Sequence, residues 1–262
     1  MDNLEPYNFL QLGINVRVFR EKLQLGAAAS TCVAESLRKA LSQRGEANLI
    51  LATGASQYEF LDALRLEKDV DWSQINAFHL DEYIGLTSQH PASFRRYLKE
   101  RVFKYLPFKT IHLLQGDSAD PEGEARRYAA LIAACTIDVA CIGIGENGHL
   151  AFNDPPADFN AGPLVHVQSL DLACRQQQVG EGHFLNIDDV PQKAITLSIP
   201  AILRAEMISC VTPDFRKAQA VRCALEGPLS PKCPASALRN HQNCHLFLDL
   251  HSASLLSTVN AE

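Results

Sequence analysis

The sequence predicts an α/β fold with an open, mostly parallel sheet and helices on both faces, in a Rossmann-like three-layer sandwich. Short apolar runs alternate with helical patterns along the chain, which is typical of βαβ units. Several runs are apolar at nearly every position, as expected of strands buried on both faces of a parallel sheet. The predicted strands are residues 16–19, 48–52, 75–80, 137–144, 194–199, 207–211 and 245–248.

Helical spacing of apolar residues predicts helices between these strands. Asp120 and Pro121 are a typical N-cap and first helical residue, and they open a helix that continues to about residue 134. Neither a linker nor a change of composition divides the chain, so we expect residues 1–262 to form one domain. The other predicted helices are residues 26–41, a segment around 60–64, 94–105 and 215–225.

Composition and charge exclude several classes of protein. The net charge is −6 and no cluster of Lys and Arg exists, which argues against a nucleic-acid partner. No apolar stretch approaches the roughly 20 residues that span a bilayer, and the first ten residues carry acids where a signal peptide carries Lys or Arg. We therefore expect no membrane contact and a cytoplasmic location.

Metal binding is not favoured by the arrangement of Cys and His. His241, Cys244 and His245 are close in sequence, but no CxxC pair accompanies them. The eight cysteines are scattered through apolar segments, where Cys behaves as a small hydrophobe. The sequence therefore predicts no metal site.

Three polar clusters follow predicted strands, and the first of them is Thr53-Gly54-Ala55-Ser56. Parallel sheets bind ligands at the carboxyl edge of their strands, so clusters that are distant in sequence can meet there. Backbone N–H groups and hydroxyls at the start of a helix suit a phosphate. A strand-to-helix turn with a Ser N-cap would have the same sequence, so both interpretations remain at this stage.

The second cluster contains adjacent carboxylates, Asp81 and Glu82, directly after a predicted buried strand. Carboxylates at the edge of a pocket lose solvation, and this can tune one of them to act as a general base. The alternative is a solvated loop in which Asp81 caps a turn.

The third cluster is residues 143–156, a glycine-rich segment that contains His149 and Asp154. His149 can transfer protons near neutral pH, and Asp154 can orient its imidazole. A dinucleotide-binding loop is the competing interpretation, because the segment begins Gly-x-Gly-x-x-Gly. The sequence His-Leu-Ala-Phe-Asn-Asp-Pro that follows cannot continue as the long helix such a loop requires.

Together these segments resemble the glucosamine-6-phosphate deaminase (isomerase) family, in the same order from about residue 48 to residue 249. The family's phosphate loop is similar to residues 52–56, and its DEY-x-GL segment is similar to residues 81–86. The GxGxxGHxAFNxP loop is present around His149, and Lys217-Ala218 leading to Glu226-Gly227 is a further match.

The resemblance implies a role for each matching residue. Asp81 would move the proton from C2 to C1 of the open-chain sugar, and His149 would open the pyranose ring with help from the acid at Asp154. Asn147 stands where the family often has an acid, and Asp154 stands for its usual Glu. The residues expected to bind substrate or phosphate are Thr53, Gly54, Ala55, Ser56, Glu82, Lys217 and Arg175, the last being the nearest counterpart of a phosphate-binding Arg.

The function that the resemblance implies is conversion of glucosamine 6-phosphate to fructose 6-phosphate and ammonia in amino-sugar catabolism, without a redox cofactor. A deaminase for galactosamine 6-phosphate is an alternative, as is a 6-phosphogluconolactonase, although that family has DER where this chain has Asp81-Glu82-Tyr83. A sugar-phosphate-sensing regulator is disfavoured, because about 45 residues before the first matched strand leave no room for a DNA-binding module. A non-catalytic binder and a homo-oligomer are left open.

Overall fold

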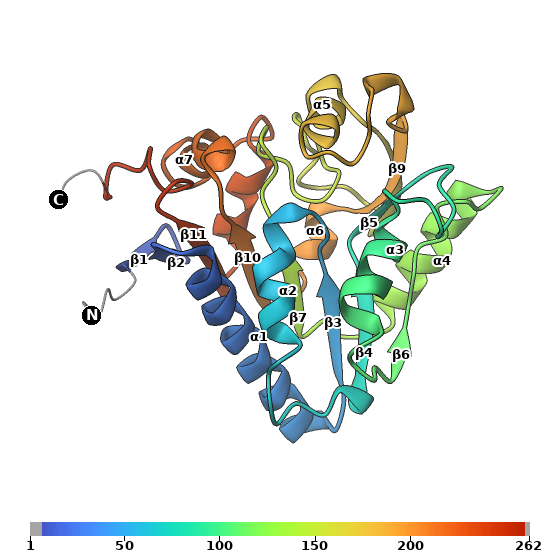
Figure 1. The fold of residues 1–262 in the computed structure, drawn as a ribbon, viewed down its shortest axis with the longest axis horizontal. Coiled ribbons are helices and arrows are strands. Elements are labelled where there is room, and N and C mark those ends of the chain that lie inside the picture. The colour runs from blue at the N-terminus through green and yellow to red at the C-terminus, as the bar shows by residue number, and fades with distance from the viewer. Residues whose placement is uncertain (1–6, 260–262) are drawn as a thin grey trace.

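The computed structural model describes residues 7–259, and its centre is an eight-stranded sheet with the order β1-β2-β11-β10-β7-β3-β4-β6 (Figure 1). Only β1 and β2 pair antiparallel, while the other neighbours in this sheet pair parallel. The strands are β1 Tyr7–Gln11, β2 Ile14–Phe19, β3 Ala47–Leu51, β4 Ile75–His79, β6 Thr110–Ile111, β7 Val139–Ile142, β10 Met207–Thr212 and β11 Cys244–Asp249.

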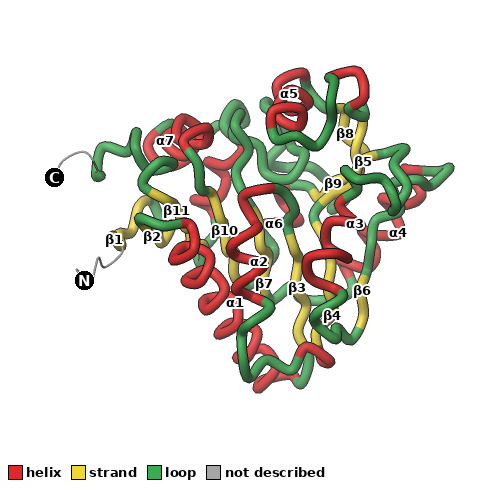
Figure 2. The backbone as a smooth tube through the Cα atoms, viewed as in Figure 1, coloured by secondary structure: helices red, strands yellow, loops and turns green. Residues whose placement is uncertain are grey.

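Helices cover both faces of this sheet, as the tube view also shows (Figure 2). Alternate residues of β3 divide between two cores: Leu49 and Leu51 pack under the first two helices, whereas Ile50 belongs to the core on the opposite face. This confirms the predicted mostly parallel sheet between two helical layers. The helices are α1 Lys22–Arg44, α2 Tyr58–Leu64, α3 Phe94–Leu98, α4 Pro121–Ala133, α5 Leu172–Gly180, α6 Ile199–Ile202 and α7 Ala218–Glu226.

A second, antiparallel sheet corrects one prediction. Residues 194–199 were expected in the parallel sheet, but β9 (Lys193–Leu197) is the central strand of a separate three-stranded sheet with β5 (Asp81–Tyr83) and β8 (Val165–Ser169). The prediction was wrong because Ala194 to Leu197 are all buried, so β9 lacks the alternation that marks most antiparallel strands. The small sheet extends the carboxyl edge of the main sheet.

The predicted helix opening at Asp120 is confirmed. The Asp120 carboxylate accepts a hydrogen bond from the backbone N–H of Gly123, and Pro121 is the first residue of α4. No helix of the described residues is long and apolar enough to cross a membrane.

Gly26 lets α1 touch the backbone of α2. A Cβ atom added to Gly26 would lie 2.5 Å from the carbonyl carbon of Glu59 and 2.8 Å from the backbone nitrogen of Phe60. Backbone atoms cannot move aside as a flexible side chain can, so only glycine allows this separation. The packing of α1 on α2 therefore depends on the missing side chain.

Gly26→Ala should lower the free energy of unfolding by roughly 1–3 kcal/mol, because the overpacking outweighs the better helix propensity of Ala. Gly180→Ala is the matched control, since a Cβ atom at that helical position meets nothing within 4 Å. Denaturant unfolding of both variants checks this. Equal or greater stability of Gly26→Ala than of the parent chain would contradict the contact.

Candidate active site

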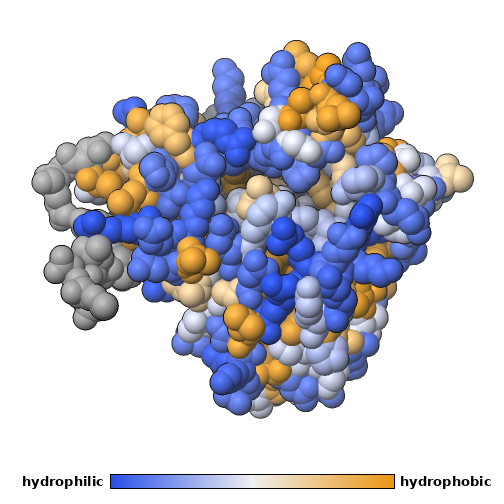
Figure 3. Space-filling model, in the orientation of Figure 1, coloured by the Kyte–Doolittle hydropathy of each residue, from blue (hydrophilic) through white to orange (hydrophobic). Residues whose placement is uncertain are grey.

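A polar pocket lies where the carboxyl ends of the main strands meet the small antiparallel sheet. The pocket is lined by residues from all three sequence clusters, namely Thr53, Gly54, Ser56, Asp81 and His149, and also by Lys217. The segment that carries α5 contributes to the pocket wall, and apolar side chains gather over that segment on the molecular surface (Figure 3). The remaining lining residues are Ala52, Leu80, Phe94, Gly143, Ile144, Gly145, Ala151, Phe152, Gln177, Gln178, Glu181 and His183.

Asp81 and Glu82 point to different sides of β5, as successive residues of a strand do. Asp81 lines the pocket and is 7% exposed. Glu82 is fully buried and does not line the pocket. Its carboxylate accepts hydrogen bonds from Ser93 Oγ at 2.8 Å, from the backbone N–H of Arg95 at 3.0 Å and from Arg95 Nε at 3.3 Å. Glu82 therefore holds the start of α3, and the structure does not place it with the other predicted binding residues.

Burial is the main cause that raises the pKa of Asp81 well above the usual value of 3.8, and the negative charge of Glu82 adds to it. A carboxylate with a raised pKa is a stronger base than an ordinary one. Asp81 thus combines access to the pocket with the basicity that proton abstraction needs.

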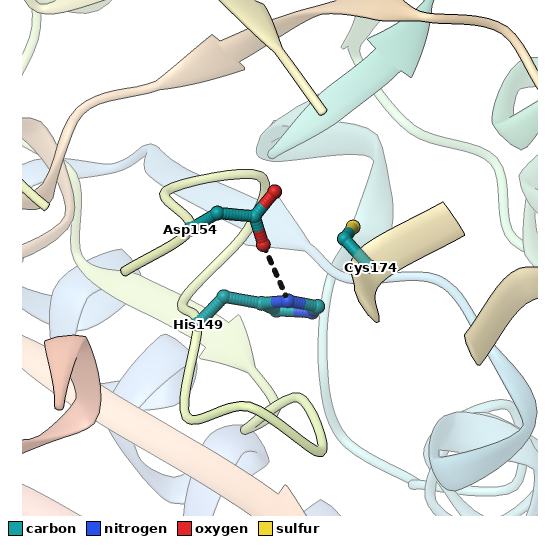
Figure 4. Close-up of side chains that lie close together, drawn as sticks. All are labelled: His149, Asp154 and Cys174. Carbon is teal, nitrogen blue, oxygen red and sulfur yellow. Dashed lines mark hydrogen bonds and ion pairs between the residues drawn. The ribbon is translucent and has the colours of Figure 1, made fainter. Parts of the chain in front are cut away.

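His149 is held by Asp154, as the close-up shows (Figure 4). Its Nδ1 lies 3.1 Å from Asp154 Oδ1. Burial raises the pKa of Asp154, but the hydrogen bond with His149 and further partners lower it below the usual value. Because an ionised carboxylate only accepts, Nδ1 carries the proton and Nε2 is left as an acceptor. His149 can therefore take a proton from a group in the pocket.

Asn147 and Gly145 complete the support of His149. Asn147 accepts from the backbone N–H of His149 at 3.0 Å and donates from Nδ2 to Asp154 Oδ1 at 3.0 Å. Gly145 lies directly against the imidazole, since an added Cβ atom would be 2.2 Å from His149 Nε2. The two residues fix the ring, while neither Asn147 nor Asp154 lines the pocket.

Figure 4 also places Cys174 beside this pair, and the three side chains could in principle hold a metal ion. The ligand atoms lie within 4.8 Å of one another. However, burial raises the pKa of the Cys174 thiol strongly, and the charges of Asp154 and Asp171 raise it further. The Nδ1 atom of His149 and the Oδ1 atom of Asp154 already face each other at 3.1 Å in a hydrogen bond. The chemistry of this donor set favours a hydrogen-bonded histidine.

The loop after β3 presents part of the predicted phosphate cradle. Gly54 has a φ of 103°, and its carbonyl accepts from the hydroxyl of Tyr97 at 2.8 Å, which turns this carbonyl toward α3. Ser56 Oγ accepts from Gln57 Nε2 at 3.0 Å. Ala55 begins a 3₁₀ turn that leads into α2 and does not line the pocket itself.

The two predicted basic residues differ in position. Lys217 is 4% exposed and lines the pocket. Arg175 does not line it, because its Nη2 donates to the backbone carbonyls of Ile187 at 2.6 Å and Val190 at 3.2 Å. The guanidinium instead fastens α5 to the loop that follows, so Arg175 is not brought to the other predicted phosphate-binding residues.

Sequence reasoning missed the pocket residues of the α5 segment, namely Gln177, Gln178, Glu181 and His183. Gln177 Nε2 donates to Glu181 Oε1 at 2.8 Å, and Gln177 Oε1 accepts from the backbone N–H of Glu146 at 3.0 Å. These polar residues belong to no motif. The one local signal is the Gly180-Glu181-Gly182 sequence, which places a single acid between two glycines.

The carboxyl edge of this doubly wound sheet carries a buried carboxylate and a histidine that a second carboxylate holds. This combination is typical of enzymes that act on small polar molecules. A family model for glucosamine-6-phosphate isomerases/6-phosphogluconolactonase matches residues 20–247. The chain belongs to this family, which confirms the resemblance seen in the sequence.

Individual relatives agree with the family match. The chain is 39% identical over 207 residues to a glucosamine-6-phosphate deaminase of Exiguobacterium sibiricum, covering 79% of this chain and 80% of the relative. It is 35% identical over 224 residues to the glucosamine-6-phosphate deaminase of Streptococcus pneumoniae serotype 4, covering 86% and 94%.

Solved structures share the fold. A monomeric glucosamine-6-phosphate deaminase superimposes with a TM-score of 0.85 at 32% identity, covering 92% of this chain and 99% of that one. A 6-phosphogluconolactonase from Shewanella baltica, at 20% identity, superimposes with a TM-score of 0.73 over 89% of this chain and 96% of its own. The second likeness establishes the fold alone.

Glu82→Ala should lower the free energy of unfolding by roughly 3–5 kcal/mol, because Arg95 Nε and several buried N–H groups at the start of α3 lose their acceptor, although Nη1 and Nη2 of Arg95 keep theirs. Ser93→Ala, which removes one of these hydrogen bonds and the N-cap bond to the backbone N–H of Arg96, should cost less, about 1–2 kcal/mol. Denaturant unfolding measures both. Unchanged stability of Glu82→Ala together with a raised KM would instead make Glu82 a substrate ligand.

Asp81→Asn should stabilise the protein at neutral pH. The pKa of this Asp is raised on folding, so its ionisation costs stability as pH rises from its ordinary value through the raised one. Removal of the charge should raise Tm by roughly 2–4 °C for each kcal/mol recovered. Calorimetry at pH 7 measures the difference in Tm between Asp81→Asn and the parent chain. This difference should become smaller near pH 4. A lower Tm for Asp81→Asn at pH 7 would count against a strained carboxylate.

Proposed function

We propose that this protein converts glucosamine 6-phosphate and water to fructose 6-phosphate and ammonia. The observation that carries the proposal is the position of Asp81, which lies in one pocket with His149 and with the Thr53 to Ser56 loop. The names of its relatives and the shared fold support the same reaction.

His149 acts first in the proposed sequence. With its Nδ1 proton committed to Asp154, Nε2 accepts the proton of the anomeric hydroxyl and the imidazolium returns a proton to the ring oxygen. This opens the pyranose to the aldehyde. Asn147 and Asp154 act through His149, because they position the ring without lining the pocket.

Asp81 then transfers a proton within the open-chain sugar. It takes the proton from C2 while the aldehyde oxygen gains a proton from the substrate's own ammonium group, which yields an enolamine. Asp81 then returns its proton at C1, which leaves an iminium at C2. Water adds to this carbon and ammonia departs, so that the ketose phosphate remains. A single carboxylate can serve both carbons only if the sugar is anchored, and anchoring at the phosphate supplies this orientation.

The phosphate site in this proposal consists of the Thr53 to Ser56 loop and Lys217. Phosphate is recognised by backbone N–H groups, hydroxyls and a cation, all of which this end of the pocket offers. Arg175 has no part in it, because it does not line the pocket and its Nη2 donates to backbone carbonyls. Galactosamine 6-phosphate, the C4 epimer, is the second candidate substrate.

Asp81→Asn should lower kcat for ammonia release from glucosamine 6-phosphate by about 10²- to 10⁴-fold, the usual contribution of a general base. Binding of inorganic phosphate should change by less than about threefold, since the substituted side chain keeps its size. A coupled ammonia assay and calorimetric titration measure the two quantities. Unchanged kcat would remove Asp81 from the role of base.

The same assay distinguishes the competing reactions. Galactosamine 6-phosphate and 6-phosphogluconolactone are offered in parallel, with ammonia release and lactone hydrolysis as readouts. Lactone hydrolysis without ammonia release would replace the deaminase proposal by that of a lactonase. The cytoplasmic location and a homo-oligomeric state remain predictions that fractionation and sedimentation can test.

A further inference from the structure

The ammonium group of Lys217 is already paired within the protein. Its Nζ lies 3.4 Å from Glu181 Oε1 and 3.9 Å from Glu146 Oε1. The side chains of Lys217 and Glu181 are 5% and 8% exposed, so solvent screens this ion pair little. Among the lining residues of the described chain, Lys217 is the one Lys or Arg. An anion that enters the pocket therefore meets a cation whose charge is already neutralised.

Glu181 is held as a carboxylate by its surroundings. Burial raises its pKa, but the neighbouring His183, the charge of Lys217 and the hydrogen bond from Gln177 outweigh burial and lower the pKa to about 2. The distance from Glu181 Oε2 to His183 Nε2 is 3.5 Å. At neutral pH Glu181 therefore keeps its negative charge in the pocket wall.

A phosphate and the Glu181 carboxylate cannot both contact the Lys217 ammonium without mutual repulsion. Like charges close together at a partly buried site interact strongly, because water screens them poorly. A phosphoryl group that pairs with Lys217 would lie beside Glu181. One of the two anions therefore has to leave.

The surroundings of Glu181 leave room for its side chain to move. A Cβ atom added to Gly180 or Gly182 would meet nothing within 4 Å, so the space beside both residues is open, while the backbone N–H groups of Glu181 and Gly182 are hydrogen-bonded to α5. Gly182 has a φ of 79°, in the region that glycine adopts without strain. By contrast, Cys174, Phe184 and Val190 of the same segment are buried in a small core with Tyr83. Glu181 can thus swing out while the rest of the segment stays in place.

We propose that Glu181 is an exchangeable counter-ion of Lys217, which pairs with the ammonium in the ligand-free protein and is replaced there by the phosphate of the substrate. Glu181 then lowers the affinity of the pocket for the phosphate of the substrate, since each binding event must first break the ion pair between Glu181 and Lys217. It also favours dianionic phosphate over singly charged groups, which compete less well with a carboxylate. This inference rests on the proposed function, because it takes the sugar's phosphate as the displacing anion.

Calorimetric titration with inorganic phosphate at pH 7.5 tests the exchange in the parent chain, in Glu181→Gln and in Glu146→Gln. Glu181→Gln keeps the size and hydrogen-bonding capacity of the side chain and removes its charge, so phosphate should bind about 10-fold more tightly. Glu146→Gln is the matched control: its carboxylate is farther from Lys217 and 34% exposed, and phosphate affinity should change less than about twofold. Glu181→Ser serves as a second variant with the same expected direction.

Unchanged or weaker phosphate binding in Glu181→Gln would overturn the exchange, because Glu181 would then position Lys217 or be irrelevant to it. An equal gain in Glu146→Gln would also overturn it, since the effect would reflect overall potential. The titration needs no turnover, so the two proposals can fail separately. If the parent chain releases no ammonia but Glu181→Gln binds phosphate more tightly, the proposed reaction is refuted and the exchange is supported.

Discussion

The burial of Glu82 against Arg95 and the first turn of α3 is the interaction on which the geometry of the pocket depends. Successive side chains of a strand point in opposite directions, so anchoring Glu82 in the interior leaves Asp81 facing the pocket. The same anchor places a negative charge one residue away from Asp81, and this charge contributes to its raised pKa. The buried Glu82 thus fixes the direction of the candidate base and adds to a basicity that comes mainly from the burial of Asp81 itself.

The small antiparallel sheet gives this arrangement its rigidity. At Asp81 the chain leaves the main parallel sheet, and β5 pairs with β9, where Asp81 lies opposite Thr196. Thr196 also accepts, through its hydroxyl, the backbone N–H of Phe152 at 3.1 Å. The carboxylate and the loop that carries His149 are therefore fixed to the same strand, although they are far apart in sequence.

Much of the fold followed from local patterns, because all parallel strands except the exposed two-residue β6 are short apolar runs, and Asp120-Pro121 has the chemistry of a helix start. The small sheet did not, since β5 has only three residues and β9 is buried on both sides. Glu82 and Asp81 look equivalent in sequence, and only the pairing of β5 decides which of them faces the pocket. Arg175 is a second case that local sequence does not decide. An Arg suits phosphate, but here its Nη2 donates to backbone carbonyls of the loop after α5.

The acidic residue in the α5 segment could not be found from sequence for a related reason. Glu181 reaches Lys217 only because residues 172–190 fold across the carboxyl edge of the sheet, and that path is set by apolar contacts of Phe184 and Val190. The pocket consequently contains a carboxylate of raised pKa and an ammonium that is neutralised by Glu181.

The most direct test of this account is the ionisation of Asp81 itself, observed by ¹³C NMR of the side-chain carboxyl carbons during a pH titration, with Asp81→Asn to assign the signal. The account predicts that Asp81 titrates well above 3.8, the usual value for Asp. Titration at or below that value would contradict it, because the carboxylate would then be neither strained by burial nor prepared to act as a base.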